Sequence, residues 1–319
     1  LGVMKVVANN FIDITDQAGV YAGVTNAVAL CDGDIYIGTE NGLKIIKKNG
    51  MIMQNELSEY LGDARIRNIE EDNAGNIWIA TYTHDLGLVC QGQDGTITSF
   101  TTDNGMPSNQ VREITTLEDG RVLVGTNGGL AVIKDGMIIQ TVGASDEIKN
   151  TVFLSVVESN EGVILVGTDG DGIYAIEEDR VKKIGRDNGL TSDVVMRIVN
   201  DEKRGIMWIV TSNSIEYMKN GLVTQVTTFP YNNNYDIYFD DNDNAWILSS
   251  YGVYVVNANE MEKDAISDFR IYTIANGLPY AITSNSFGCR DDEGNLYMAG
   301  RNGVIKVNIN KYFNEDAEV

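Results

Sequence analysis

The chain has 319 residues, of which 43% are hydrophobic and 22% charged, a balance typical of globular proteins that can bury a core. Its 24 Lys and Arg stand against 46 Asp and Glu, and the formal charge of -22, without a basic cluster interleaved with aromatic residues, argues against nucleic acid as a partner. The same field disfavours sulfated or other polyanionic ligands and favours neutral or cationic ones, on condition that the local binding surface resembles the average.

The three cysteines, Cys31, Cys90 and Cys289, lie in apolar strand-like runs without metal-binding or redox spacing, so we expect small buried side chains. No run of about 18 apolar residues occurs, nor a charged leader followed by an apolar segment, and we expect no direct membrane contact from this fragment. The chain opens at Leu1 inside a strand-like run, which favours a piece of a longer protein.

An apolar strand that ends in a small or hydroxyl residue recurs along the chain. Its seven copies are IYIGT at 35–39, IWIAT at 77–81, VLVGT at 122–126, ILVGT at 164–168, MWIVT at 207–211, AWILS at 245–249 and LYMAG at 296–300. The last residues of successive copies lie 42, 45, 42, 43, 38 and 51 positions apart. A period near 40 to 45 residues is typical of propeller blades with four strands each.

Each copy lies within a unit of four expected strands. A strand such as 111–117 comes first, the recurring strand second, and a third strand such as GGLAVI follows a Gly-containing turn. Asn-Gly or Asp-Gly pairs then favour type I′ hairpins into the fourth strand, at 49–50, 94–95, 135–136 and 220–221. No segment has helical periodicity. The sequence therefore predicts an all-β fold, a single seven-bladed β-propeller of four-stranded antiparallel blades.

The last unit lacks a fourth strand, whereas residues 11–14 precede the first unit without a partner. We expect this N-terminal strand to complete the last blade and close the ring, which covers an edge prone to aggregation. Residues 2–7 are one strand too many, either a remnant of an upstream blade or a segment packed outside the ring. The expected ranges are 1–14 for the closing strands, 15–54, 55–100, 101–142, 143–184, 185–228, 229–272 and 273–312 for the blades, and 313–319 for a tail towards a following domain.

Copies five to seven depart from the repeated pattern, because Val210, Leu248 and Gly300 stand where Gly or Thr is expected, and less regular blades are predicted there. Trp78, Trp208 and Trp246 share one position in the second strand, which assigns them to packing between blades.

The run DDNDN at 240–244 resembles a calcium loop at positions one, three and five. However, Ala245 stands at position six, where an EF-hand has Gly, and Tyr251 at position twelve, where it has Glu. The run aligns with EDNAGN of the second unit, so an ordinary hairpin turn is the preferred interpretation. No phosphate-binding glycine loop and no zinc spacing occurs. We predict no metal, no cofactor and no catalytic residue.

Turns between second and third strands share one face with the connections between blades, by antiparallel alternation, and we expect a ligand on this loop face. The turn 82–86 holds the single histidine, either as a contact for a sugar ring or cation or as a solvated loop residue. The loop 231–235 is either a carbohydrate or peptide surface or a polar loop anchored by its tyrosines. The predicted ligand-binding residues are Tyr82, His84, Asp85, Asp169, Asp171, Tyr231, Asn233, Tyr235, Tyr251, Tyr280 and Arg301. Of these, Asp169, Asp171 and Arg301 are each also explained by turn chemistry.

Three stretches resemble the two-component regulator propeller repeat, found in extracytoplasmic sensor regions of bacterial membrane receptors. They are DNAGNIWIAT at 72–81 with Gly87 and Leu88 after it, TDNGMPSNQV at 102–111 and RDNGLTSDVV at 186–195. Residues 276–308 resemble the terminal blade of that family. The resemblance implies a periplasmic or cell-surface location in a membrane-anchored protein, followed by an immunoglobulin-like domain, a membrane span and a histidine kinase or diguanylate cyclase output. It also implies homodimerisation through the full-length receptor.

The leading hypothesis is a non-catalytic sensor domain that binds a small molecule, such as an oligosaccharide, on the loop face. A protein-docking propeller differs from it only in the size of the partner. The enzymatic alternative is a propeller glycoside hydrolase or lyase. Most carboxylates lie in hairpin turns on the opposite face, DNAGNIW lacks the Ser-x-Asp-x-Gly-x-Thr-Trp form of sialidase repeats, and a streptogramin-type lyase would depend on His84 alone.

Overall fold

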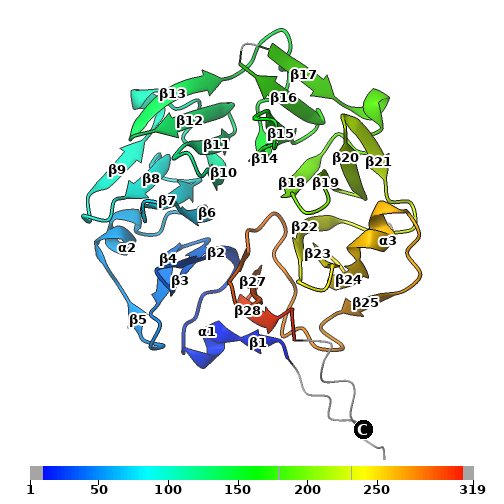
Figure 1. Ribbon diagram of the computed structural model, residues 1–319. Coiled ribbons are helices and arrows are strands. Elements are labelled where there is room, and N and C mark those ends of the chain that lie inside the picture. Colours follow the sequence, from blue (N-terminus) through cyan, green and yellow to red (C-terminus); the bar gives the residue numbers. More distant parts are fainter. Residues whose placement is uncertain (1–9, 179, 231, 312–319) are drawn as a thin grey trace, which may run out of the picture.

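A computed structural model describes residues 10–178, 180–230 and 232–311. These residues form seven four-stranded antiparallel sheets, which follow one another around a ring with the first strand of each sheet nearest the centre (Figure 1). The predicted seven-bladed propeller is therefore confirmed. Residues 2–7, with their unassigned strand, lie outside the described residues.

The strands of the first three blades are β2 (Thr25–Cys31), β3 (Asp34–Thr39), β4 (Gly42–Ile46) and β5 (Ile52–Met53); β6 (Ile66–Glu71), β7 (Ile77–Thr81), β8 (Leu88–Gln91) and β9 (Ile97–Phe100); and β10 (Val111–Thr116), β11 (Val122–Thr126), β12 (Leu130–Lys134) and β13 (Met137–Val142). Those of the next three are β14 (Phe153–Glu158), β15 (Ile164–Thr168), β16 (Ile173–Glu177) and β17 (Arg180–Ile184); β18 (Val195–Asp201), β19 (Ile206–Thr211), β20 (Ile215–Lys219) and β21 (Leu222–Gln225); and β22 (Asn234–Phe239), β23 (Asn244–Ser249), β24 (Val253–Asn257) and β25 (Phe269–Tyr272).

The seventh blade is closed by the N-terminal strand. Its sheet order is β1-β28-β27-β26, built from β1 (Ile12–Asp13), β28 (Gly303–Asn308), β27 (Asn295–Gly300) and β26 (Cys289–Arg290). Ile12 pairs with Lys306 across the junction, and the blue and red ends of the ribbon meet there (Figure 1). The predicted closure is confirmed, and the edge of β28 is covered.

Three short helices lie in connections where no helix was expected: α1 (Ile14–Gln17), α2 (Glu56–Leu61) and α3 (Ala258–Glu262). α2 begins after Asn55, whose side chain accepts the Ser58 N–H, and buries Leu57 and Leu61 against the first two blades. Segments of four to six residues are too short to establish a helical period in sequence. Within the described ranges no helix has the length and apolarity that a membrane span requires.

The second strands pack between blades, as predicted for the tryptophans. Trp78, Trp208 and Trp246 are at most 4% exposed, which confirms their assignment to the core. Each indole Nε1 donates a hydrogen bond to the aspartate that opens the preceding hairpin turn: Trp78 to Asp72 (2.8 Å), Trp208 to Asp201 (3.0 Å) and Trp246 to Asp240 (3.1 Å). The repeated motif thus joins a turn to the core.

The glycine of the recurring strand allows neighbouring blades to approach closely. A Cβ on Gly38 would lie 2.5 Å from Ile66 Cγ2, and one on Gly167 would lie 2.7 Å from Val195 Cγ1. Val210 and Leu248 occupy this position in blades five and six, are buried, and leave both sheets with four strands. Both blades thus keep four strands, although α3 lies between β24 and β25 of blade six, and blade seven has a first strand of only two residues.

The hairpins into the fourth strands divide into two kinds. At 135–136 and 220–221 both central residues have positive φ, as a type I′ turn requires. At 49–50 and 94–95 only the glycine does, so the type I′ prediction is wrong there. Gly50 N bonds Lys47 O and Lys47 N bonds Met51 O, the pattern of a type I turn with a glycine bulge.

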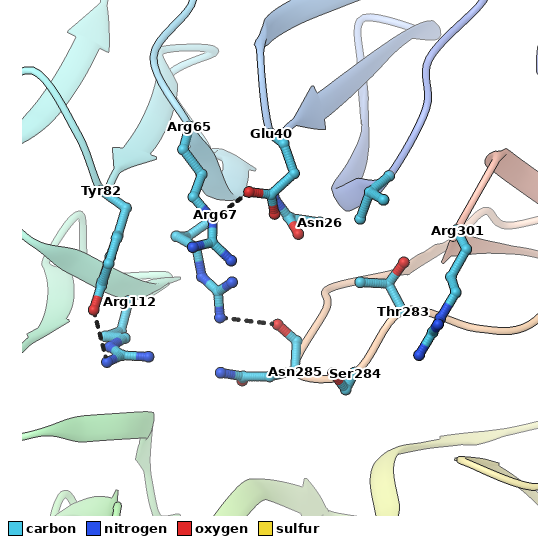
Figure 2. Close-up of a pocket in the computed structure, with 11 residues that line it drawn as sticks. Asn26, Glu40, Arg65, Arg67, Tyr82, Arg112, Thr283, Ser284, Asn285 and Arg301 are labelled. Carbon is cyan, nitrogen blue, oxygen red and sulfur yellow. Dashed lines mark hydrogen bonds and ion pairs between the residues drawn. The ribbon is translucent and has the colours of Figure 1, made fainter.

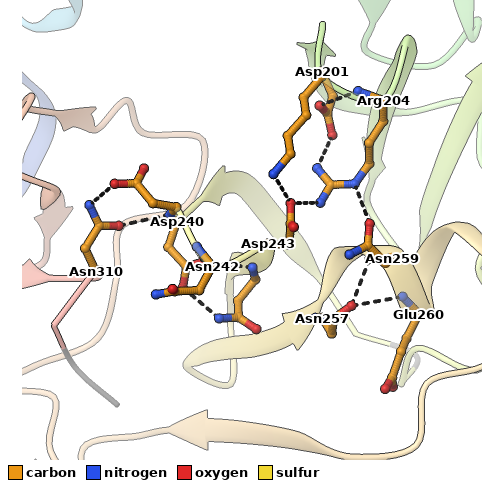
Figure 3. A network of polar contacts seen from close by, with 12 residues as sticks. Asp201, Arg204, Asp240, Asn242, Asp243, Asn257, Asn259, Glu260 and Asn310 are labelled. Carbon is orange, nitrogen blue, oxygen red and sulfur yellow. Dashed lines mark hydrogen bonds and ion pairs between the residues drawn. The ribbon is translucent and has the colours of Figure 1, made fainter. Parts of the chain in front are cut away.

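The acidic run 240–244 forms the hairpin turn between β22 and β23, as predicted. Asp240 Oδ1 accepts the N–H groups of Asn242 (2.9 Å) and Asn244 (2.8 Å), and Asp243 pairs with Lys203 and Arg204 of the neighbouring blade (Figure 3). These carboxylates hold a turn and join blades five and six. In the described parts of the chain no group of three or more His, Cys, Asp or Glu could hold a metal ion.

The cysteines are free thiols. Cys31 is buried, as expected, whereas Cys90 and Cys289 are half-buried. Burial raises the pKa of all three thiols, which keeps them protonated and unreactive.

Candidate ligand-binding site

A pocket of about 420 Å³ opens at the loop end of the ring axis. Its walls come from blades one, two, three and seven (Figure 2). Four arginines, one tyrosine and one glutamate line it, together with the start of a loop from the last blade: Arg65, Arg67, Arg112, Arg301, Tyr82, Glu40 and residues 283–285. Larger cavities, of about 460, 540 and 580 Å³, are lined by residues of blades one and seven, of blades four and five, and of blade four, and no arginine cluster lines any of the three.

Two of the arginines are presented by bulges in the innermost strands. The register of β6 against β7 shifts between Ile66 and Asn68, and that of β10 against β11 shifts between Val111 and Glu113. Arg67 and Arg112 are the residues left out of the two ladders. A bulge bends the strand and re-aims its side chain, and both guanidinium groups accordingly lie in the pocket (Figure 2).

Tyr82 lies among three of these cations. The guanidinium carbons of Arg112, Arg65 and Arg67 are 4.9, 5.5 and 5.8 Å from the centroid of its ring. Its hydroxyl oxygen accepts hydrogen bonds from Arg112 Nη2 (3.0 Å) and Asn127 Nδ2 (3.1 Å). Both lone pairs are used, so the hydroxyl hydrogen is available to an acceptor on a ligand.

The charges in the pocket are unbalanced. Arg65 Nε lies 3.0 Å from Glu40 Oε2, but among the described residues Arg67, Arg112 and Arg301 form no ion pair. Arg67 is 6% exposed, donates one hydrogen bond of 3.3 Å to Asn285 O, and has no partner for its Nε. Burial and the adjacent Arg65 and Arg112 lower the pKa of Arg67 to about 10.

The pocket is therefore positive in a chain whose formal charge is -22. The expectation of neutral or cationic ligands depended on a local surface that resembles the average. That condition is not met here, because local charges decide the potential inside a cleft.

Residues 283–285 line the pocket and belong to the segment 283–288, here called the axial loop, which runs from blade seven to the centre of the ring (Figure 1). Phe287 N donates to Asn26 O (2.8 Å), and Val28 N donates to Phe287 O (3.0 Å). Arg197 Nη2 donates to Ser286 O (2.8 Å), and its guanidinium carbon lies 3.8 Å from the Phe287 ring centroid. Contacts to blades one and five thus hold this loop in place.

An ion cluster links the first strands of several blades near the axis. Arg197 pairs with Glu113 (3.1 Å) and with Asp236 (3.2 Å), and all three side chains are almost fully buried. Burial raises the pKa of Glu113 to about 7. Burial, and then the charge of Glu113, raises the pKa of Glu70 to about 8. One arginine faces several carboxylates, which favours protonation of part of the cluster.

Of the residues predicted to bind a ligand, Tyr82 and Arg301 line the pocket. His84 and Asp85 lie in the same turn as Tyr82 but not in the lining, and both have positive φ. His84 Nε2 lies 3.2 Å from Asp63 Oδ1, with both side chains largely exposed, so the histidine has an acidic partner that the sequence did not identify.

The other predicted residues lie away from the pocket lining. In blade four, the Asp169 carbonyl accepts a hydrogen bond from Asn150, and the Asp171 carboxylate binds Tyr174 and Lys183, whose hydrogen bonds lower its pKa against the opposing effect of burial. Asn233 and Tyr251 are exposed, Tyr235 and Tyr280 are buried in the core between blades six and seven, and Tyr231 lies outside the described residues. A binding role for these residues stays a prediction.

Sequence reasoning did not select Arg65, Arg67 or Arg112. Their signal is a basic residue at the start of an innermost strand, in RIRN at 65–68 and VRE at 111–113, where blade one has TNA. These basic residues predict a site only when the bulges and the closed ring, which bring them together, are known.

The fold and the pocket define a seven-bladed β-propeller with a site at one end of its axis. Within this class, residues 60–83, which include Arg65, Arg67 and Tyr82, match the family described as two component regulator propeller. This match confirms, for one repeat, the resemblance found in the sequence.

The extracellular domain of a hybrid two-component system from B. thetaiotaomicron has a similar structure, with a TM-score of 0.79 and 20% identity, over 97% of this chain and 42% of that one. Virginiamycin B lyase from Staphylococcus aureus has a TM-score of 0.70 and 15% identity, over 93% of this chain and 97% of the lyase. An uncharacterized lipoprotein of Mycoplasma genitalium is 24% identical over 220 residues, which are 67% of this chain and 16% of the lipoprotein. At such identities the two structures share a fold, and the chain spans under half of the extracellular domain and under a fifth of the lipoprotein.

Proposed function

We propose that this chain is a non-catalytic ligand-sensing domain of a bacterial membrane signalling receptor, located outside the cytoplasm. It binds a small molecule in the pocket of Arg65, Arg67, Arg112, Tyr82 and Arg301 on the loop face. The observation that carries the proposal is the convergence on one cavity of polar side chains from four blades, three of them arginines that form no ion pair among the described residues. The similarity to an extracellular domain of a two-component system, and to a lipoprotein, supports the location.

The pocket suits binding better than catalysis. Its lining contains one carboxylate, Glu40, which is paired with Arg65, and no histidine or cysteine. A general acid and base pair is therefore lacking among the lining residues. A volume of about 420 Å³ lies in the range of small-molecule sites and matches a ligand the size of one or two sugar rings.

A lyase is the second candidate, because the fold of virginiamycin B lyase is matched over nearly its whole length. His84 with Asp63 is the pair that would serve such an activity. Loss of turnover of a substrate in His84→Ala, with ligand affinity retained, would favour the enzyme over the sensor.

Thermal unfolding against a panel of oligosaccharides, organic acids and peptides tests the proposal. A ligand at 100 times its Kd adds about 2.7 kcal/mol to the free energy of unfolding. We expect the shift to fall in Tyr82→Phe, which removes the hydroxyl and keeps the ring, and to persist in Tyr251→Ala on the same face. A shift lost in Tyr251→Ala and kept in Tyr82→Phe would place the site on blade six, and no shift from any compound would favour protein docking.

A further inference from the structure

From the charges and the shape of the pocket, we infer that its ligand is a small organic dianion. One oxyanion group binds between Arg67 and Arg112, and the second binds Arg301. The inference rests on the proposed function and names the chemical class of the ligand.

The first step is the state of Arg67. A guanidinium has five N–H donors, and this one, although buried, makes a single hydrogen bond of 3.3 Å and no ion pair. A buried charge without a partner costs several kcal/mol. An oxyanion in the pocket supplies the missing acceptors and the missing charge, and guanidinium groups bind carboxylate or phosphate oxygens two at a time.

The second step is the arrangement of the walls. Arg67 and Arg112 lie with Tyr82 on one side of the pocket, Arg301 lies on the other side, and Ser284 and Asn285 of the axial loop lie between them (Figure 2). Arg301 has an exposed side chain without a carboxylate partner. Two separated cationic sites across one cavity of about 420 Å³ fit a molecule with an acidic group at each end.

The third step excludes cationic and neutral ligands. A cationic ligand would add to the charge of Arg67, Arg112 and Arg301, and the single carboxylate, Glu40, is taken by Arg65. A neutral ligand would leave Arg67 buried and uncompensated. The four arginines and Glu40 give the lining a formal charge of +3, which two negative groups lower to +1. The Tyr82 hydroxyl and Thr283 Oγ1, which is buried without a hydrogen-bond partner among the described residues, serve polar groups of the ligand.

Isothermal titration at low ionic strength tests the inference with three six-carbon probes. Glucarate, glucuronate and glucose carry two, one and no carboxylates, and inorganic phosphate and sulfate report a single oxyanion. We expect glucarate to bind most tightly, glucuronate about tenfold more weakly and glucose not measurably. Arg301→Gln removes an exposed charge without affecting folding. We expect it to weaken the binding of glucarate about tenfold and the binding of glucuronate far less.

Arg180→Gln is the matched control, because it removes the same charge from a side chain that is 81% exposed in the hairpin of blade four. An equal loss of glucarate affinity in Arg180→Gln and Arg301→Gln would overturn the inference, because the overall charge of the protein would then explain the loss. So would glucose binding as tightly as glucarate, or no binding by any anionic probe. If neutral sugars bind and depend on Tyr82, the inference fails while the proposed function stands; if no compound binds at all, both fail.

Discussion

In Arg67 the proposed ligand binding and the stability of the fold make opposite demands on one side chain. Its guanidinium is buried beside two other cations, and its pKa is lowered to about 10 because the folded state disfavours the charge. Below that pH the arginine is charged in both states, so its burial lowers the free energy of unfolding. Binding sites often keep such unfavourable groups.

Replacement of Arg67 by methionine, which has a similar length and no charge, is predicted to raise the free energy of unfolding by about 1 kcal/mol. Arg112→Met is the comparison, because Arg112 makes hydrogen bonds to Asn127 and Tyr82 and its loss should be destabilising. Urea unfolding measures both. A destabilisation by Arg67→Met as large as that by Arg112→Met would show that Arg67 supports the fold instead.

The site was predicted only in part at this scale. Tyr82 and Arg301 follow from their place in turns on the loop face, which antiparallel alternation determines. The positions of Arg67 and Arg112 in the pocket depend on β-bulges, which no residue type in the sequence predicts. The two buried tyrosines, Tyr235 and Tyr280, show that a polar loop sequence does not reveal which side chains turn inward.

At the scale of elements, an aspartate opens hairpin turns and also binds the tryptophan of the next strand. Asp240 accepts two backbone N–H groups and the Trp246 indole, while Asp94, in an exposed turn of blade two, accepts the Thr96 N–H and binds no tryptophan. The turns were predictable because the repeat aligns them. Their types were not, since Asn-Gly and Asp-Gly fit both a type I′ turn and a type I turn with a glycine bulge.

Asp240→Ala is predicted to lower the free energy of unfolding by about 2 kcal/mol, because it removes the acceptor of a buried indole N–H and also frees the turn. Asp94→Ala should leave the urea midpoint nearly unchanged. Equal effects of the two substitutions would mean that the link between turn and core contributes nothing.

Across the whole molecule, the ring is joined by β1 at its edge and by the Arg197 cluster near its axis. The closing strand was predictable from strand counting, whereas the cluster joins Arg197 to residues 84 and 39 positions away and has no sequence signature. In the folded protein Glu113 and Glu70 have raised pKa values, about 7 and 8. Between pH 5 and 8 the folded state therefore holds protons that the unfolded state has released, and stability falls as pH rises through this window.

In Glu70→Gln the free energy of unfolding is predicted to fall less steeply as the pH rises. At pH 8 it should be higher than that of the wild type by at least about 1 kcal/mol. Urea unfolding at pH 5 and pH 8 on both proteins gives the comparison. The same decline in the variant as in the wild type would assign the pH dependence to other groups.

A ligand site at the loop end of the axis is tested most directly by backbone hydrogen exchange with and without saturating glucarate. We expect slower exchange at residues 65–67, at the turn 82–87 and in the axial loop, with the hairpin turns of the opposite face unchanged. Slower exchange confined to the hairpin face or to blades four and five, or no change at saturation, would contradict it.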